Sequence, residues 1–133
     1  MKPERMLDIE IGGKEYSVQE AKTKEELTQG LSNIDSLPKD QGMLFYFNEP
    51  QEVSMWMKDT NIPLDIIFIN EDLQVTKVYQ GQPNDETLVS EPNTLYVLEV
   101  NINSGIKEGD VLEFDEDDED APVMWVLAPD ESK

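Results

Sequence analysis

The sequence predicts a single, mainly β domain of the α+β class, in which a curved or barrel-like, mostly antiparallel sheet carries one short helix. Seven to nine short apolar runs, several alternating with polar residues, are typical of β-strands. One segment has the start signal and the spacing of a helix. The connections between the runs are short, which favours antiparallel pairing of neighbouring strands.

The N-terminal part predicts a β-hairpin followed by the helix. Leu7–Ile11 and Lys14–Val18 flank a Gly-Gly pair, and glycine supplies the positive φ angles of a tight hairpin turn. Thr23 is the expected start of the helix, because its hydroxyl can cap the first turn while Glu26 reaches back in a capping box. Gly30 is the expected end, since glycine often terminates helices.

The rest of the chain predicts short strands separated by loops. A continuously apolar run suits a strand buried on both faces, and an alternating run suits a strand with one buried face. Asn48–Pro50 is expected to break the chain between two strands, and Gly81–Asn93, with its two prolines, to form a long surface loop. The expected strands are Met43–Phe47, Val53–Lys58, Leu64–Ile69, Leu73–Tyr79, Leu95–Val100, Val111–Phe114 and Val123–Leu127.

The chain is expected to form one domain over residues 1–133, with an acidic loop insert at 115–120 and a tail at 128–133. It has 30 acidic and 10 basic residues, a formal net charge of −20. This charge disfavours nucleic acids and anionic membranes as partners, because both are negatively charged. It favours cationic partners, although its simplest effect is to keep the domain soluble.

The absence of histidine and cysteine excludes several kinds of site. A Ser-His-Asp or Cys-His active site is impossible, and so is a zinc site with nitrogen or sulfur ligands. The sequence therefore predicts no catalytic residue, no cofactor and no metal. No apolar segment has the length of a signal peptide or a membrane helix, so the cytoplasm is the expected location.

Several short motifs are similar to those of one known family. They are Thr23–Glu26, Gly30-Leu31, Gly42–Phe45, Trp56–Lys58, Ile62–Asp65, Tyr96–Val100 and Gly105–Asp110. Over about Tyr16 to Phe114 the chain resembles the uncharacterised family catalogued as domain of unknown function 192. The resemblance implies a compact, mainly β domain, but it supplies no activity that could be carried over to individual residues. The chain departs from the family pattern at Ser32–Asp35, where a methionine and a basic residue are usual.

Three charged residues lie in otherwise apolar strands: Lys58, Asp65 and Glu99. Buried carboxylates are costly unless they are paired or hydrated. If the three strands adjoin, Lys58 could neutralise one carboxylate while Trp56 walls a cleft. The sequence therefore predicts a small polar pocket that binds a ligand or a cation. Two alternatives stay open: a buried ion pair that fixes the strand register, and carboxylates that cap backbone groups at strand ends.

The acidic run is a second candidate site, for a partner rather than a small ligand. Adjacent carboxylates repel one another and are strongly hydrated, so the run is expected to be a solvated loop. It lacks the glycine and the glutamate of a helix-loop-helix calcium site. A docking loop for a basic partner is the functional alternative. Its residues are Asp115, Glu116, Asp117, Asp118, Glu119 and Asp120.

The sequence is consistent with three functional hypotheses. The leading hypothesis is a non-enzymatic accessory or structural domain that binds another protein, either a basic one or part of a larger assembly such as a viral particle. The second is a small-ligand or cation-binding pocket at Trp56, Lys58, Asp65 and Glu99. The third is a carboxylate-based enzyme acting on carbohydrate, which requires Asp65 and Glu99 in one cleft.

Overall fold

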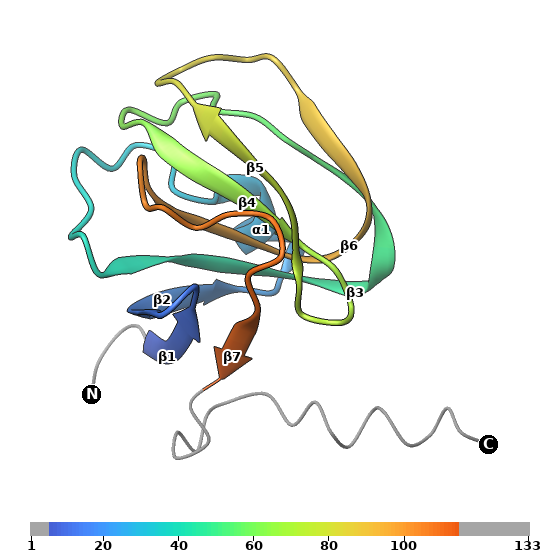
Figure 1. The fold of residues 1–133 in the computed structure, drawn as a ribbon. Helices are drawn as coiled ribbons and strands as arrows, with labels where there is room; N and C mark the ends of the chain where they lie inside the picture. The colour runs from blue at the N-terminus through green and yellow to red at the C-terminus, as the bar shows by residue number, and fades with distance from the viewer. Residues whose placement is uncertain (1–5, 115–133) are drawn as a thin grey trace.

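The computed structural model describes residues 6–114, which form one curled sheet of seven strands and one short helix (Figure 1). The mainly β fold predicted from the sequence is confirmed. Within residues 6–114 no helix has the length and hydropathy that a membrane span requires. The acidic run at 115–120, the strand predicted at 123–127 and the tail lie outside the described residues. The elements are β1 (Met6–Ile11), β2 (Lys14–Ala21), α1 (Lys24–Gln29), β3 (Gln41–Met55), β4 (Leu64–Ile69), β5 (Val75–Gly81), β6 (Val89–Asn101) and β7 (Leu112–Phe114).

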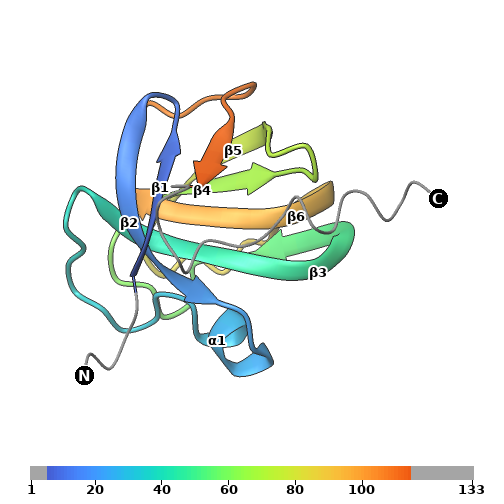
Figure 2. The same ribbon diagram turned by 90° about the horizontal axis from the view of Figure 1, so that it is seen from below.

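The strands follow the order β5-β4-β6-β3-β2-β1-β7, and the sheet curls into a half-barrel (Figure 2). Its two ends meet where Gln74, just before β5, forms an isolated bridge with Val111, just before β7. The backbone N–H of Val75 donates to the carbonyl of Asp110, and that of Leu112 donates to the carbonyl of Leu73, both at 2.8 Å. These bonds hold the two ends of the sheet together.

The predicted hairpin and helix are both present. β1 and β2 pair antiparallel, with Gly12 (φ 59°) and Gly13 (φ 78°) in the turn. β2 and β3 pair in parallel, and α1 lies in the connection between them. Parallel neighbours need a crossover connection rather than a tight turn. This crossover is what brings α1 against one face of the sheet (Figure 2).

Two predicted breaks in the strands are wrong. Asn48–Pro50 does not end a strand, because β3 continues past it to Met55 with shifts in its register against β6. β6 begins at Val89, inside the segment predicted as a loop, and carries Pro92 at one of these shifts. A proline cannot donate to a regular ladder, but a bulge leaves residues unpaired and can contain one.

Apolar side chains fill both faces of the sheet. Successive side chains of a strand point to opposite faces, so β4 and β6 contribute to both clusters. The cluster inside the curl includes Leu7, Ile9, Ile11, Val18, Leu44, Ile67, Leu98, Val100 and Leu112. The cluster on the opposite face, beside α1 and the loop that follows it, includes Leu31, Met43, Phe45, Leu64, Ile66, Phe68 and Val97. The strand pairing therefore decides which polar residues share a face.

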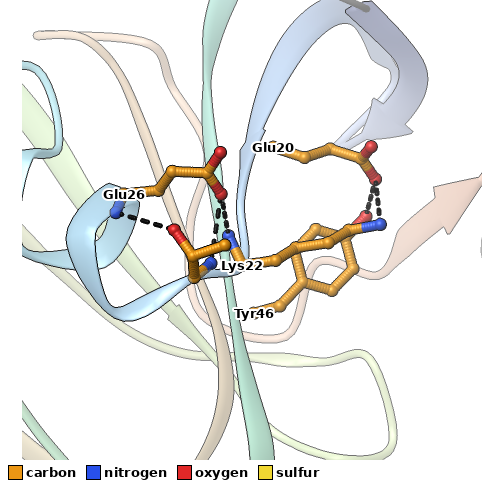
Figure 3. A network of polar contacts seen from close by, with 5 residues as sticks. Glu20, Lys22, Glu26 and Tyr46 are labelled. Atoms are coloured by element: carbon orange, nitrogen blue, oxygen red, sulfur yellow. Dashed lines mark hydrogen bonds and ion pairs between the residues drawn. The ribbon is translucent and has the colours of Figure 1, made fainter.

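Polar contacts tie β2, α1 and β3 together (Figure 3). The hydroxyl of Tyr46 donates to the carboxylate of Glu20, and the ammonium of Lys22 lies 3.6 Å from that carboxylate. The hydroxyl of Thr23 accepts a bond from the backbone N–H of Glu26 at 3.1 Å. In return, the carboxylate of Glu26 accepts bonds from the backbone N–H groups of Lys22 and Thr23. The predicted capping box is therefore confirmed.

The capping box at the start of α1 contributes to the stability of the domain. Thr23→Ala removes the side chain that satisfies a free N–H group of α1, so we expect a loss of about 1 kcal/mol of unfolding free energy. Urea denaturation followed by circular dichroism measures this loss. Thr28→Ala is the matched control, because Thr28 lies inside α1, makes no capping bond and alanine is the better helix former. Equal losses in both variants would contradict the capping role.

Candidate functional site

A cleft of about 360 Å³ opens on the face of the sheet that carries α1. One wall is α1 with the turn that follows it, and the other is β3 with the segment from Trp56 to Thr60. A side-chain carbon at Gly30 would lie 3.2 Å from the ring of Phe45, so the turn after α1 packs directly on the sheet. Three of the four predicted ligand-binding residues line this cleft: Trp56, Lys58 and Glu99.

Glu99 lies at the base of the cleft with no partner in the described part of the chain. It occupies the middle of β6, between Met43 on β3 and Ile66 on β4, and is only 4% exposed. Among residues 6–114 its carboxyl makes no hydrogen bond or ion pair, although every fully buried side-chain nitrogen or oxygen there has a hydrogen-bond partner. The carboxyl therefore keeps its remaining access through the cleft, which it lines.

Burial determines the protonation of Glu99. It raises the pKa of the carboxyl from its usual value of 4.5 to about 8. The cause is the loss of hydration, which disfavours the charged form. At neutral pH the group is therefore mainly the uncharged acid, which can donate one hydrogen bond and accept others.

Trp56 and Lys58 form the exposed rim of the cleft. The indole of Trp56 is 44% exposed, and the ammonium of Lys58 lies 5.4 Å from the ring centroid. The backbone around them is fixed on both sides: the N–H of Met57 donates to the carbonyl of Asp85, and the carbonyl of Asp59 accepts from the loop after α1. This anchoring holds the indole at the mouth of the cleft.

Asp65 does not belong to the cleft. It pairs with Val100, so its side chain points to the face inside the curl, whereas Glu99 shares the opposite face with Ile66. Its carboxylate accepts bonds from the hydroxyl of Ser104 at 2.6 Å, the N–H of Ser104 at 2.9 Å and the N–H of Asn103 at 3.3 Å. Asp65 therefore caps backbone groups of the turn that follows β6.

Three expectations about this group of residues need correction. Lys58 does not lie in a strand, because β3 ends at Met55 and Lys58 lies in the turn that follows it. In the described residues no ion pair joins Lys58 to Asp65 or Glu99, and Lys58 lies against Trp56 instead. The two carboxyls do not face one cleft, because the sheet lies between them. A pair of carboxyls that acts on a glycosidic bond must flank it about 5–9.5 Å apart. The geometry thus gives no support to the carboxylate-based enzyme.

The prediction missed the residues that α1 and the hydroxyl groups contribute to the cleft. Lys24, Thr28 and Gln29 belong to α1, and the other hydroxyl groups of the lining are those of Ser32, Ser54 and Thr60. The sequence indicated a helix at this position but not which face of the sheet it covers. The parallel pairing of β2 with β3 sets that placement, and it was not predicted.

A second concave surface lies at the other end of the sheet. It measures about 500 Å³ and is lined by β1, β2, β7 and Asp40, the residue just before β3. Five carboxyl-bearing residues surround it: Asp8, Glu10, Glu15, Asp40 and Glu113. Within residues 6–114 no group of three or more such side chains is placed to hold a metal ion.

Comparison with known proteins places the chain in a family. Residues 7–114 match the domain of unknown function 192 (DUF192), described as “Uncharacterized ACR”. The chain belongs to the DUF192 family. This confirms the resemblance predicted from the sequence, and no functionally curated protein matches the chain.

Two crystal structures are similar to this DUF192 domain. A protein of unknown function from Novosphingobium aromaticivorans is 34% identical, with a TM-score of 0.78 over 82% of this chain and 85% of its own. A protein from Sinorhizobium meliloti, described as a “putative transcription regulator”, is 29% identical, with a TM-score of 0.80 over 86% of this chain and 97% of its own. Both likenesses support the fold.

Five of the seven motifs that carry the DUF192 resemblance contribute to the lining of the cleft, and the motifs Ile62–Asp65 and Gly105–Asp110 do not. The contributing residues are Lys24, Gly30 and Leu31, Phe45, Trp56 and Lys58, and Glu99. The departure from the family pattern at Ser32 falls there too. The cleft of this DUF192 domain is therefore the best candidate for its site.

Proposed function

We propose that the protein binds a small polar molecule in the cleft, with the carboxyl of Glu99 as the hydrogen-bonding group at its base and the indole of Trp56 as one wall. The observation that supports this most is the partnerless carboxyl of Glu99, which is 4% exposed and opens into the cleft. Hydrogen bonds are stronger where little water competes for them. A carboxyl that has no protein partner and is reached only through the cleft is therefore available to bind the polar group of a ligand.

The composition of the lining also supports ligand binding. Small-molecule sites are concave, combine apolar and aromatic walls with a few polar groups, and have volumes of about 300–1,000 Å³. Here Phe45, Phe47 and Trp56 supply the aromatic walls, and Thr60 and Glu99 supply polar groups. The volume of about 360 Å³ suits a ligand of one ring rather than a long chain. Binding is proposed rather than catalysis, because a single carboxyl faces the described cleft.

The experiment is a titration of small polar compounds followed by NMR. The indole N–H resonance of Trp56 reports occupancy, and Trp56→Ala identifies it against Trp125, the second tryptophan. Glu99→Leu removes both the donor and the acceptor while keeping an apolar side chain of similar size. We expect it to weaken binding at least about tenfold, equivalent to about 1.4 kcal/mol.

Two controls make this test specific. Leu88→Ala removes an exposed apolar side chain that does not line the cleft, and it should leave the affinity unchanged. Glu99→Gln keeps hydrogen-bonding capacity at the base and should retain most of the affinity. If Glu99→Leu binds every compound as tightly as the unaltered protein, the cleft is not the site.

Binding of another protein through Asp115–Asp120 stays a prediction, because the run lies outside the described residues. Affinity capture from the host, with the intact chain beside a variant lacking 115–120, tests it.

The cytoplasm likewise stays the predicted location of the protein, and fractionation of host cells checks it. A ligand-binding domain would suit a regulatory role such as the one described for the Sinorhizobium meliloti relative. The net charge of −20 argues against direct contact with DNA.

A further inference from the structure

The charges around the cleft differ from those of the chain as a whole. Acidic residues outnumber basic residues 30 to 10 in the sequence. Among the described residues that line the cleft the ratio is reversed, with the two lysines Lys24 and Lys58 against the single acid Glu99. Lys24 belongs to α1 and Lys58 follows β3, so the two walls contribute one ammonium group each.

Glu99 does not cancel this positive charge at neutral pH. Burial raises the pKa of Glu99 to about 8, which leaves it mainly uncharged. The strands on either side place Met43 and Ile66 next to it, and neither side chain titrates. Across the cleft, the charged groups of the described lining are Lys24 on α1 and Lys58 after β3. The lining thus carries two positive charges and a hydrogen-bond donor.

Screening limits how far the acidic groups elsewhere in the chain act on this local excess. At physiological ionic strength the Debye length is about 8 Å, so solvent-exposed charges farther away are largely screened. The positively charged lining would disfavour a cationic ligand inside the cleft. Such a ligand would be repelled by the ammonium groups of Lys24 and Lys58, and it would find an uncharged acid rather than a carboxylate at the base.

We infer that the cleft selects small organic anions, with a carboxylate that pairs with Lys24 and Lys58 and accepts a hydrogen bond from Glu99, and with a ring that lies on Trp56. This inference rests on the proposed function, because it concerns the ligand class of the same cleft. Carboxylates make strong charge-assisted hydrogen bonds with ammonium groups, and the exposed indole offers a flat apolar surface.

The test uses two sets of probes that share a ring and differ in charge. One set is glucuronate, glucose and glucosamine, and the other is benzoate, benzamide and benzylamine. Each is titrated into the full-length protein at neutral pH, with the Trp56 indole resonance as the readout. The carboxylate member of at least one set should bind about tenfold or more tightly than its uncharged and amine counterparts.

Lysine variants and pH give independent readouts. Lys24→Met and Lys58→Met should each weaken carboxylate binding several-fold. Lys77→Met is the matched control, since Lys77 also lies over an aromatic ring, 5.6 Å from that of Tyr79, but does not line the cleft. Above about pH 8, ionisation of Glu99 should weaken carboxylate binding by up to about tenfold per pH unit in the unaltered protein, but not in Glu99→Gln.

The outcomes separate this inference from the proposed function. If an uncharged or amine probe binds at Trp56 more tightly than its carboxylate counterpart, the anion inference is overturned while ligand binding in the cleft stands. If no probe shifts the Trp56 resonance at about 10 mM, both the inference and the proposed function fail, because even millimolar affinity would be visible.

Discussion

Replacing Glu99 with glutamine is expected to remove most of the pH dependence of stability between about pH 5 and pH 8. The carboxyl has a pKa of about 8 when folded and about 4.5 when exposed in the unfolded chain. Between these values the unfolded chain releases the proton while the folded protein keeps it. The folded state binds more protons, so the free energy of unfolding falls as the pH rises. The contribution of Glu99 to the free energy of unfolding is fully present below about pH 4.5, and it is lost above about pH 8.

The size of this effect follows from the displacement of the pKa. A shift of one pH unit corresponds to about 1.4 kcal/mol, so the displacement of Glu99 corresponds to about 5 kcal/mol at most. Hydration through the cleft reduces this upper limit. Few other groups contribute to the pH dependence of stability between about pH 5 and pH 8, because the chain has no histidine, the side chain that ordinarily titrates in this range. A single buried carboxyl therefore dominates the expected profile.

Urea denaturation at pH values from about 5 to 8, at constant ionic strength, measures the free energy of unfolding at each pH and so tests the prediction. The unaltered protein should lose several kcal/mol of unfolding free energy over this range, while Glu99→Gln should lose much less. Glu86→Gln is the control, because Glu86 is exposed and does not line the cleft, and it should follow the unaltered protein. A flat profile for the unaltered protein would mean that Glu99 is ionised throughout, and it would remove its role as a hydrogen-bond donor.

Local patterns predicted the elements of this fold well where one signal acts alone. The Gly-Gly turn, the Thr23–Glu26 capping box and the apolar run at Leu64–Ile69 all form as predicted. The two strand breaks that were predicted wrongly lie where pairing between strands overrides a local signal. Asn48–Pro50 and Pro92 are strand breakers by composition, yet the long pairing of β3 with β6 continues past them through shifts in register.

The spatial grouping of the candidate residues was predictable in part. The structure brings Trp56, Lys58 and Glu99 together, since all three line the cleft, and their role in ligand binding stays a prediction. Asp65 was grouped with them wrongly, because the face that it occupies depends on the register between β4 and β6. A shift of one residue would move every side chain of a strand to the other face. Most of β4 and the second half of β6 are buried on both faces, so no alternation in either sequence reveals that register.

The position of Asp65 makes it a structural residue, and Asp65→Asn is expected to cost about 3 kcal/mol of unfolding free energy. Three bonds from Asn103 and Ser104 reach its carboxylate. In the variant an amide nitrogen, itself a donor, must face some of these donors, and breaking one side of a buried charged contact is costly. Asp72→Asn is the control, because Asp72 is exposed in the turn between β4 and β5. Urea denaturation of both variants measures the difference.

We expect Asp65→Asn to destabilise the structure around the turn at Asn103–Ser104 more than the rest of the domain. The turn at Asn103–Ser104 leads into the segment whose backbone bonds close the two ends of the sheet, including that from Leu112 to Leu73. Hydrogen exchange of the Leu112 amide should therefore accelerate in Asp65→Asn more than that of amides in the centre of β6.

Burial raises the pKa of Tyr16, and the negative charge of Asp65 raises it further. The pKa of Tyr16 should therefore fall in Asp65→Asn. Because the sheet separates Asp65 from Glu99, affinity at the cleft should stay unchanged. A loss of affinity would show instead that the two faces are coupled through β4 and β6.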